Sequence, residues 1–316
     1  MARRGDALGK DVCCIDDLRR LGTQRLTPMV RGMNITRQRS RLRPLQNPPS
    51  YPRECAKFKI CMGLSSYSTY ALEDVILEGQ GTPYAIQMCV LRDRSLTLQL
   101  LERAEKAGYK ALFVPVDVPV LGHRLNEWRN DFRIPPDMSY PNILSNGADR
   151  SSRTDYDPSL DWESAFPWLR KHTSMKIWLQ GVMSPEDIEL AICHGADGII
   201  ISNHGGRQLD GVPSTLDALR ACAPAAKGKI PIALDGGIRR GSDIFKALAL
   251  GADYCFSGEF LFGGSLMVAR GGVELALKIL QMELRTTMAL SGCRTIADIQ
   301  KCYLSVLRPD GDLAKW

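Results

Sequence analysis

The apolar run Gly198-Ile-Ile-Ile201, followed directly by Ser202-Asn-His-Gly-Gly-Arg-Gln-Leu-Asp-Gly211, says most about the architecture of this chain. A short β-branched run of this kind is typical of a strand buried on both faces in a parallel sheet. The polar residues after it would lie at the carboxyl end of that strand, where α/β barrels carry their chemistry. His204 and Arg207 place a proton acceptor and a fixed cation on one glycine-rich loop. This pairing suits removal of a proton from a substrate that also carries a carboxylate.

Apolar runs of the same kind occur on both sides of this stretch, separated by amphipathic segments. Ser95–Gly108 ends on a glycine, Ser184–Ala191 begins with a serine, a proline and two acids, and Gly241–Gly251 has helical spacing. These are boundary signals of helices. Repeated strand–helix units predict an α/β fold of the TIM (β/α)8 barrel type. The expected strands are Lys59–Met62, Tyr84–Gln87, Ala111–Val114, Lys176–Leu179, Gly198–Ile201, Ile230–Leu234 and Tyr254–Phe256.

Three strings in the chain resemble the FMN-dependent α-hydroxy acid oxidases and dehydrogenases, the family of glycolate oxidase, L-lactate oxidase and the flavin domain of flavocytochrome b2. They are Ser202–Asp210, Leu234–Asp243 and Lys246–Gly251, and the likeness extends from about Leu64 to about Cys302. The resemblance implies a TIM barrel, FMN as the cofactor, and oxidation of an L-α-hydroxy acid to the α-keto acid.

The resemblance also implies roles for five residues near the substrate. His204 matches the family's catalytic base, and Asp117 matches the carboxylate that hydrogen-bonds this base and stabilises its charged form. Arg124 and Arg207 match the two guanidinium groups that clamp the substrate carboxylate, a geometry that fixes orientation as well as affinity. Tyr67 stands where relatives carry an aromatic ring over the substrate. The alternatives are a turn-capping role for Asp117 and surface ion pairs for the arginines.

A second group of residues matches the family's flavin contacts. Glycines let the backbone approach a phosphate, and an arginine adds positive charge. The segment matching the phosphate and ribityl site is Asp235, Gly236, Gly237, Arg239 and Gly258. The positions matching contacts of the flavin ring are Ser65, Gln87, Gln180 and Ser202. For Asp235–Gly237 taken alone, a plain turn is the alternative.

The chain departs from the family at several of these positions. Relatives carry Lys at Gln180, Arg at Glu259, Tyr at Cys89 and Thr at Pro115. A neutral amide at Gln180 would stabilise the reduced flavin less than a cation does. Residues 1–57 also show no strand followed by a helix and no match to the family's Pro-Thr-Ala flavin loop, so we expect a barrel that lacks its first β/α unit.

These departures keep a second interpretation open, a degenerate or truncated homologue with weak or no FMN binding and no turnover. A third, a phosphate-binding barrel of another class such as an isomerase, leaves the stretch from Ser202 to Asp210 unexplained.

The length of 316 residues, with 44% hydrophobic and 24% charged residues, is ordinary for a soluble globular protein. We expect a basic segment at 1–57, the barrel at 58–308 with a mobile loop at 133–160, and a tail at 309–316. Much of the net charge of +6 lies in the arginine-rich segment at the start of the chain. Because no aromatic platform accompanies these arginines, a solvated basic tail is favoured over a nucleic-acid-binding arm. The expected partners are a small 2-hydroxy acid and oxygen or another electron acceptor, and Val273–Leu290 could support a homo-oligomer.

The cysteine pattern and the lengths of the apolar runs indicate in which cellular compartment the protein is expected. Ten cysteines occur without C-x-x-C spacing, which favours reduced thiols and no metal site. No apolar run reaches the length of a membrane span. The sequence Ala314-Lys315-Trp316 differs from a peroxisomal Ser-Lys-Leu signal, so a cytoplasmic location is expected over a peroxisomal one.

Overall fold

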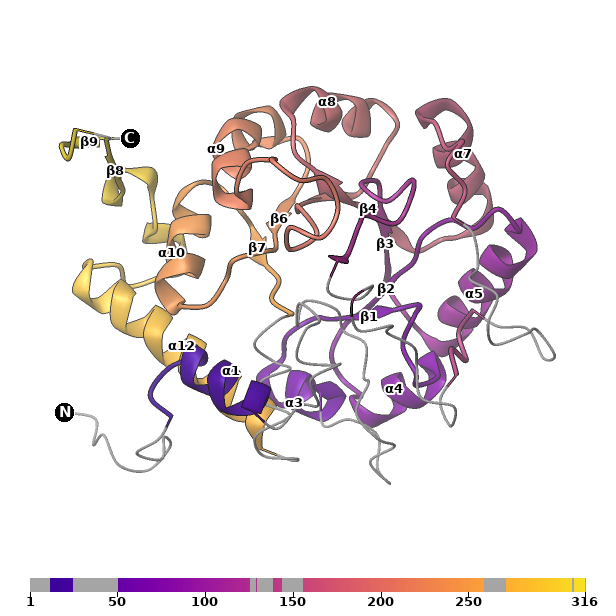
Figure 1. Ribbon diagram of the computed structural model, residues 1–316, viewed down its shortest axis with the longest axis horizontal. Helices are drawn as coiled ribbons and strands as arrows, with labels where there is room; N and C mark the ends of the chain where they lie inside the picture. The colour runs from indigo at the N-terminus through magenta and orange to yellow at the C-terminus, as the bar shows by residue number, and fades with distance from the viewer. Residues whose placement is uncertain are drawn as a thin grey trace.

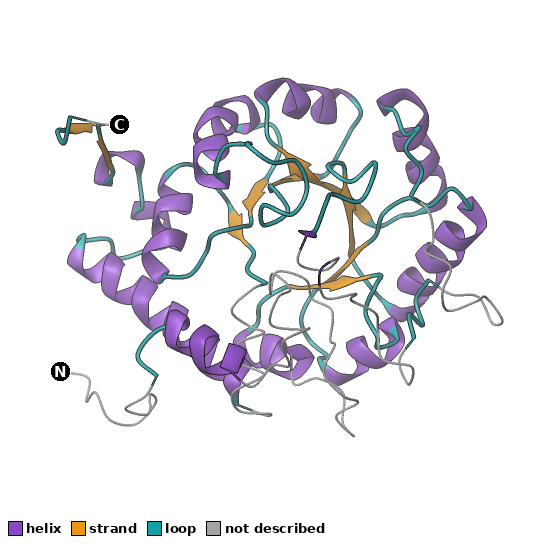
Figure 2. Cartoon of the chain, in the orientation of Figure 1, coloured by secondary structure: helices purple, strands orange, loops and turns teal. Residues whose placement is uncertain are grey.

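A parallel sheet of seven strands, each hydrogen-bonded to its neighbour in chain order, organises the molecule. The computed structural model describes residues 12–24, 51–125, 129, 139–143, 156–258, 271–308 and 310–315. The strands curl around a central axis (Figure 2), and within the described residues no pairing joins the last strand to the first. The seven strands are β1 (Met62–Ser65), β2 (Tyr84–Gln87), β3 (Ala111–Pro115), β4 (Lys176–Val182), β5 (Gly198–Ile201), β6 (Ile232–Leu234) and β7 (Tyr254–Cys255).

Helices lie outside the sheet, so each strand faces a helix on one side and the central axis on the other (Figure 1). This is the architecture of a TIM barrel, as expected, and no strand precedes β1 among the described residues. A separate antiparallel hairpin, β8 (Ser305–Leu307) and β9 (Leu313–Lys315), lies near the end of the chain. The helices are α1 (Ile15–Gln24), α3 (Tyr51–Phe58), α4 (Leu72–Glu78), α5 (Arg94–Ala107), α7 (Trp162–His172), α8 (Pro185–Cys193), α9 (Thr215–Ala226), α10 (Gly241–Ala249) and α12 (Gly272–Leu290).

Boundaries expected from sequence agree closely with those observed at four of the seven strands. β4 ends three residues later than expected, β6 begins two residues later so that residues 230–231 are not part of the strand, and the first strand differs most. β2 and β5 have the expected ends, and α5 begins after an Asp93 cap and ends at Gly108 in the left-handed conformation. The expectation of a strand over Lys59–Met62 was wrong for residues 59–61. These residues leave α3 through a turn in which Lys59 has a φ of 54°, and pairing starts only with Met62 opposite Tyr84.

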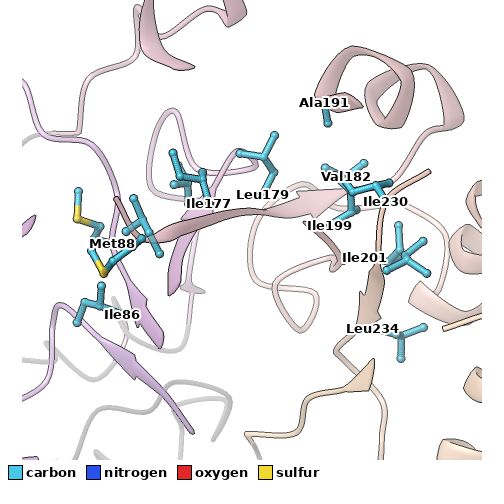
Figure 3. Packing of buried hydrophobic residues seen from close by; sticks show 14 of the residues in the cluster. Ile86, Met88, Ile177, Leu179, Val182, Ala191, Ile199, Ile201, Ile230 and Leu234 are labelled. Atoms are coloured by element: carbon cyan, nitrogen blue, oxygen red, sulfur yellow. The ribbon is translucent and has the colours of Figure 1, made fainter. Parts of the chain in front are cut away.

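The strands β2, β3, β5 and β6 are largely buried on both of their faces. One set of side chains packs toward the helices, and Figure 3 shows Ile199, Ile201 and Leu234 in this layer, with Ala191 contributed by α8. The other set points toward the axis and forms a smaller inner cluster of Ala85, Phe113, Ile200 and Ala233. Burial on both faces explains why these strands read as continuous apolar runs.

Two helices from the start of the chain complete one side of the molecule. Val12, just before α1, and Ile15 and Leu18 within it share a buried cluster with residues of α12. The helix α3 also contacts α12. Of the expected basic segment at 1–57, the structure describes residues 12–24 and 51–57. None of the described helices is both long enough and apolar enough to span a bilayer.

Candidate active site

The candidate site is formed by inward-facing residues at the carboxyl ends of the strands. Most of them lie two residues after members of the inner cluster. Successive side chains of a strand alternate between its two faces, so the residue two places after an inward residue also faces inward. Ala85, Ile200 and Ala233 belong to the inner cluster, and the positions two residues later are polar. The resulting inward row is Ser65, Gln87, Pro115, Gln180, Ser202 and Asp235.

Hydrogen bonds link three members of this row, which come from β4 and from the ends of β5 and β6. Gln180 Nε2 donates to Asp235 Oδ2 at 2.7 Å, and the fully buried Ser202 also hydrogen-bonds Asp235. The Gln180 Oε1 atom is buried and has no hydrogen-bond partner among the described residues. Gln180 therefore presents a fixed acceptor, because its donor end is held by Asp235.

The candidate base and its carboxylate lie in contact. His204 Nδ1 is 3.1 Å from Asp117 Oδ2 and 3.2 Å from Oδ1, and each side chain is only 15% exposed. His204 has a φ of 56°, and its backbone N–H donates to Ser202 Oγ at 3.1 Å. A carboxylate on Nδ1 fixes the ring orientation and leaves Nε2 as the nitrogen that can exchange a proton with a substrate.

Both candidate clamp arginines are buried. Arg124 is 7% exposed and Arg207 is 5% exposed. The backbones of their two loops lie in close contact. A Cβ added at Gly122 would be only 2.5 Å from the carbonyl oxygen of Arg207, so only glycine fits there. The structure thus brings together the loop after β3 and the loop after β5, which carry both arginines and the Asp117–His204 pair.

Tyr67 lies beside the segment expected to form a loop over the mouth of the barrel. Its ring meets Tyr140 and Tyr156 edge to face, at centroid distances of 5.6 and 6.1 Å. The amide of Asn142 fixes one part of this segment, accepting from Leu72 N at 2.9 Å and donating to a nearby carbonyl. Most of the expected loop at 133–160 lies outside the described residues.

The expected phosphate segment follows β6 and β7. Gly236 and Gly237 have φ values of 80° and 76°, a conformation that favours glycine. Among the described residues, no atom lies within 4 Å of a Cβ added at Gly258. Thr215 Oγ1 donates to the Gly236 carbonyl at 3.1 Å, and Arg239 is exposed. Consecutive turn amides of this kind form concave anion sites. Glu259, which departs from the family pattern, lies outside the described residues.

Asp235 has its pKa raised above the ordinary value of 3.8, chiefly because burial disfavours the carboxylate. Hydrogen bonds from Ser202 and Gln180, and the nearby His204, oppose this rise in pKa. The folded chain therefore holds a proton on Asp235 more tightly than the unfolded chain does. Stability from this group is present at low pH and lost as the pH rises through the folded-state pKa.

Asp235→Asn should accordingly flatten the pH dependence of stability. We expect the free energy of unfolding of the wild-type apoprotein to decrease more than that of the variant as pH rises from acid toward neutral, because only the wild type acquires a buried charge. Urea unfolding across this range measures the effect, with the exposed Asp210→Asn as control. Equal pH slopes for the wild type and Asp235→Asn would contradict the assignment.

Two glycines of the site were missed by sequence reasoning. Gly181 has a φ of 102° and lies in a register shift of β4, and a Cβ there would be 2.6 Å from Asp117 Cγ. Gly122 allows the loop contact described above. A glycine within an apolar strand is itself a signal of a bulge or a close approach. No group of three or more metal-ligating side chains occurs in the part of the chain described.

The sequence is similar to those of known proteins. Residues 46–306 match the model of a family described as FMN-dependent dehydrogenase. The chain is 46% identical over 272 residues to the oxidase FUB9 of Fusarium oxysporum f. sp. lycopersici, covering 83% of this chain and 70% of that protein. It is 42% identical over 255 residues to the glycolate oxidase of Spinacia oleracea, covering 77% and 69%.

Among solved structures, the fold is similar to that of a soluble mutant of the membrane-associated (S)-mandelate dehydrogenase from Pseudomonas putida. The TM-score is 0.80 at 29% sequence identity, with 92% of this chain and 98% of that chain covered.

Proposed function

Because this chain belongs to the FMN-dependent dehydrogenase family, we propose that it binds FMN and oxidises an L-α-hydroxy acid to the α-keto acid. Family membership confirms the resemblance carried by the sequence motifs. The observation that best supports the activity is the contact between His204 and Asp117, on loops that also carry the buried Arg124 and Arg207.

The residues at the carboxyl edge fit FMN. The positive-φ amides at Gly236 and Gly237 suit a phosphate, and Gly258, which has no side chain, would let the phosphate approach the backbone. The buried acceptor Gln180 Oε1 suits an N–H of the flavin ring, and Ser65, Gln87 and Ser202 would line the rest of that ring. Bound FMN supplies an acceptor for the electron pair that leaves the α-carbon.

The protein's own residues would bind and orient the acid and move its proton. Arg124 and Arg207 would hold the carboxylate by paired hydrogen bonds, and Tyr67 would cover the substrate. His204 Nε2 would take the proton released on oxidation. Asp117 would hold the ring in place and stabilise its protonated form, as a buried carboxylate does for other catalytic histidines.

Arg207→Lys tests the carboxylate clamp. Lysine keeps the charge but lacks the planar fork, so we expect kcat/KM for the hydroxy acid to fall about 10- to 100-fold, the cost of one strong charge-assisted hydrogen bond. Steady-state kinetics measure this loss, with the exposed Arg220→Lys on α9 as control. An unchanged kcat/KM would remove Arg207 from the substrate site.

The activity itself is tested by titrating the purified protein with FMN and then assaying glycolate, L-lactate and L-mandelate. Oxygen uptake and dye reduction, measured in parallel, identify the electron acceptor. We expect saturable FMN binding and keto acid formation from at least one acid. Saturable binding without product, or no binding, would instead identify a homologue without turnover.

A further inference from the structure

We propose that Gln208 is a positioning residue that ties the loop after β3 to the loop after β5 and so holds Asp117 against His204. The inference rests on the proposed function of this site. Gln208 follows Arg207 directly and lies four residues after His204, but the hydrogen bonds seen for its side chain go to backbone atoms of the facing loop.

The amide of Gln208 uses both of its ends. Nε2 donates to the carbonyl oxygens of Asp117 and Val120, each at 3.0 Å, and Oε1 accepts from the N–H of Gly122, also at 3.0 Å. Two donors and an acceptor on one short side chain are found only in Gln and Asn. Glutamate lacks the donors, and lysine and arginine lack the acceptor.

These hydrogen bonds hold the segment 117–124, which has the candidate catalytic carboxylate at one end and a candidate clamp arginine at the other. The bond to the Asp117 carbonyl fixes the backbone of the residue whose carboxylate meets His204 Nδ1. The bond to Gly122 fixes the chain two residues before Arg124. The two loops approach so closely that a Cβ at Gly122 would lie 2.9 Å from Gln208 Cα.

A positioning role and a merely structural role differ in one measurable respect. If Gln208 acts through Asp117, its loss should matter little once the Asp117 carboxylate has gone, because interacting residues are not additive. If Gln208 only stabilises the loops, its loss should lower the rate by the same factor in both backgrounds. The decisive experiment is therefore a double-mutant cycle with Gln208→Leu and Asp117→Asn.

We expect Gln208→Leu to lower the rate of anaerobic flavin reduction by about 10- to 100-fold, since displacements of about 1 Å cost this much. FMN content should stay unchanged. In the Asp117→Asn background the further loss should be less than about 3-fold, a coupling of at least about 0.7 kcal/mol at the lower limit of the expected loss. Gln281→Leu, at an exposed glutamine of α12, is the matched control.

Gln208→Glu repeats the test if the leucine variant does not fold. It keeps the acceptor for Gly122 but turns an acceptor toward the two carbonyls, so the same loss is expected. A wild-type protein without flavin reduction would overturn the proposed function. An active wild type with full-rate Gln208 variants, or with equal losses in both backgrounds, would overturn only the role of Gln208.

Discussion

Replacement of His204 by asparagine is expected to lower kcat/KM for the hydroxy acid by about 100- to 10,000-fold, the usual contribution of a general base. The imidazole is held by Asp117 at 3.1 Å, and an amide cannot accept the proton. Asparagine is the appropriate replacement because His204 has a φ of 56°, which Asn tolerates better than most residues do. FMN binding and the free energy of unfolding should change little.

Rapid anaerobic mixing of the FMN-loaded protein with substrate measures this effect as the rate of flavin reduction. His172→Asn provides the control, because His172 lies at the end of α7 and contacts the Trp168 carbonyl. If His204→Asn reduced flavin at the wild-type rate while binding FMN normally, another group would have to be the base.

Gly181→Ala is expected to reduce both stability and turnover. Its φ of 102° makes any side chain strained, by about 1–2 kcal/mol. The new Cβ would also lie 2.6 Å from Asp117 Cγ and 2.8 Å from Oδ1, so the carboxylate must move away from its present position. A displaced Asp117 no longer meets His204 Nδ1, and we expect kcat/KM to fall about 10- to 100-fold.

Gly195→Ala separates these two effects. Gly195 lies between α8 and β5 and has a φ of 77°, but a Cβ there would meet no atom of the described residues within 4 Å. It should lose a similar amount of unfolding free energy from backbone strain and keep full activity. Equal kcat/KM values for the two variants would contradict a dependence of turnover on the position of Asp117.

Much of the barrel was predictable because its strands bury both faces. The runs at Tyr84–Gln87 and Gly198–Ile201 do not alternate between apolar and polar residues, so the ends of these strands are easy to identify in the sequence. The polar row of the site was also predictable, since Gln87 is the last residue of the first run and Ser202 directly follows the second. The start of β1 was not predictable, because Lys59 and Ile60 are compatible with a strand and only the turn after α3 excludes them.

The contacts that hold the candidate catalytic residues in place could not be predicted from the sequence. Gln208 and Gly122 are 86 positions apart, and Gly181 meets Asp117 only because β3 and β4 pair in the register Pro115 opposite Gln180. Such approaches depend on tertiary structure. The glycine within β4 indicates a close contact with another residue, but the sequence does not identify that residue.

Two of the positions that depart from the family pattern, Pro115 and Gln180, belong to the inward row of the candidate site. Pro115 occupies an inward position at the end of β3, where it offers no N–H. Gln180 offers a neutral amide held by Asp235. We therefore propose that this chain stabilises reduced FMN less strongly than a protein with a cation at Gln180 would.

Anaerobic mixing of the FMN-loaded wild-type protein with glycolate, L-lactate and L-mandelate asks most directly whether this barrel oxidises hydroxy acids. We expect at least one acid to bleach the visible absorption of the bound flavin, with one keto acid formed for each flavin reduced. A protein that never retains FMN, or a bound flavin that stays oxidised with all three acids, would contradict that function.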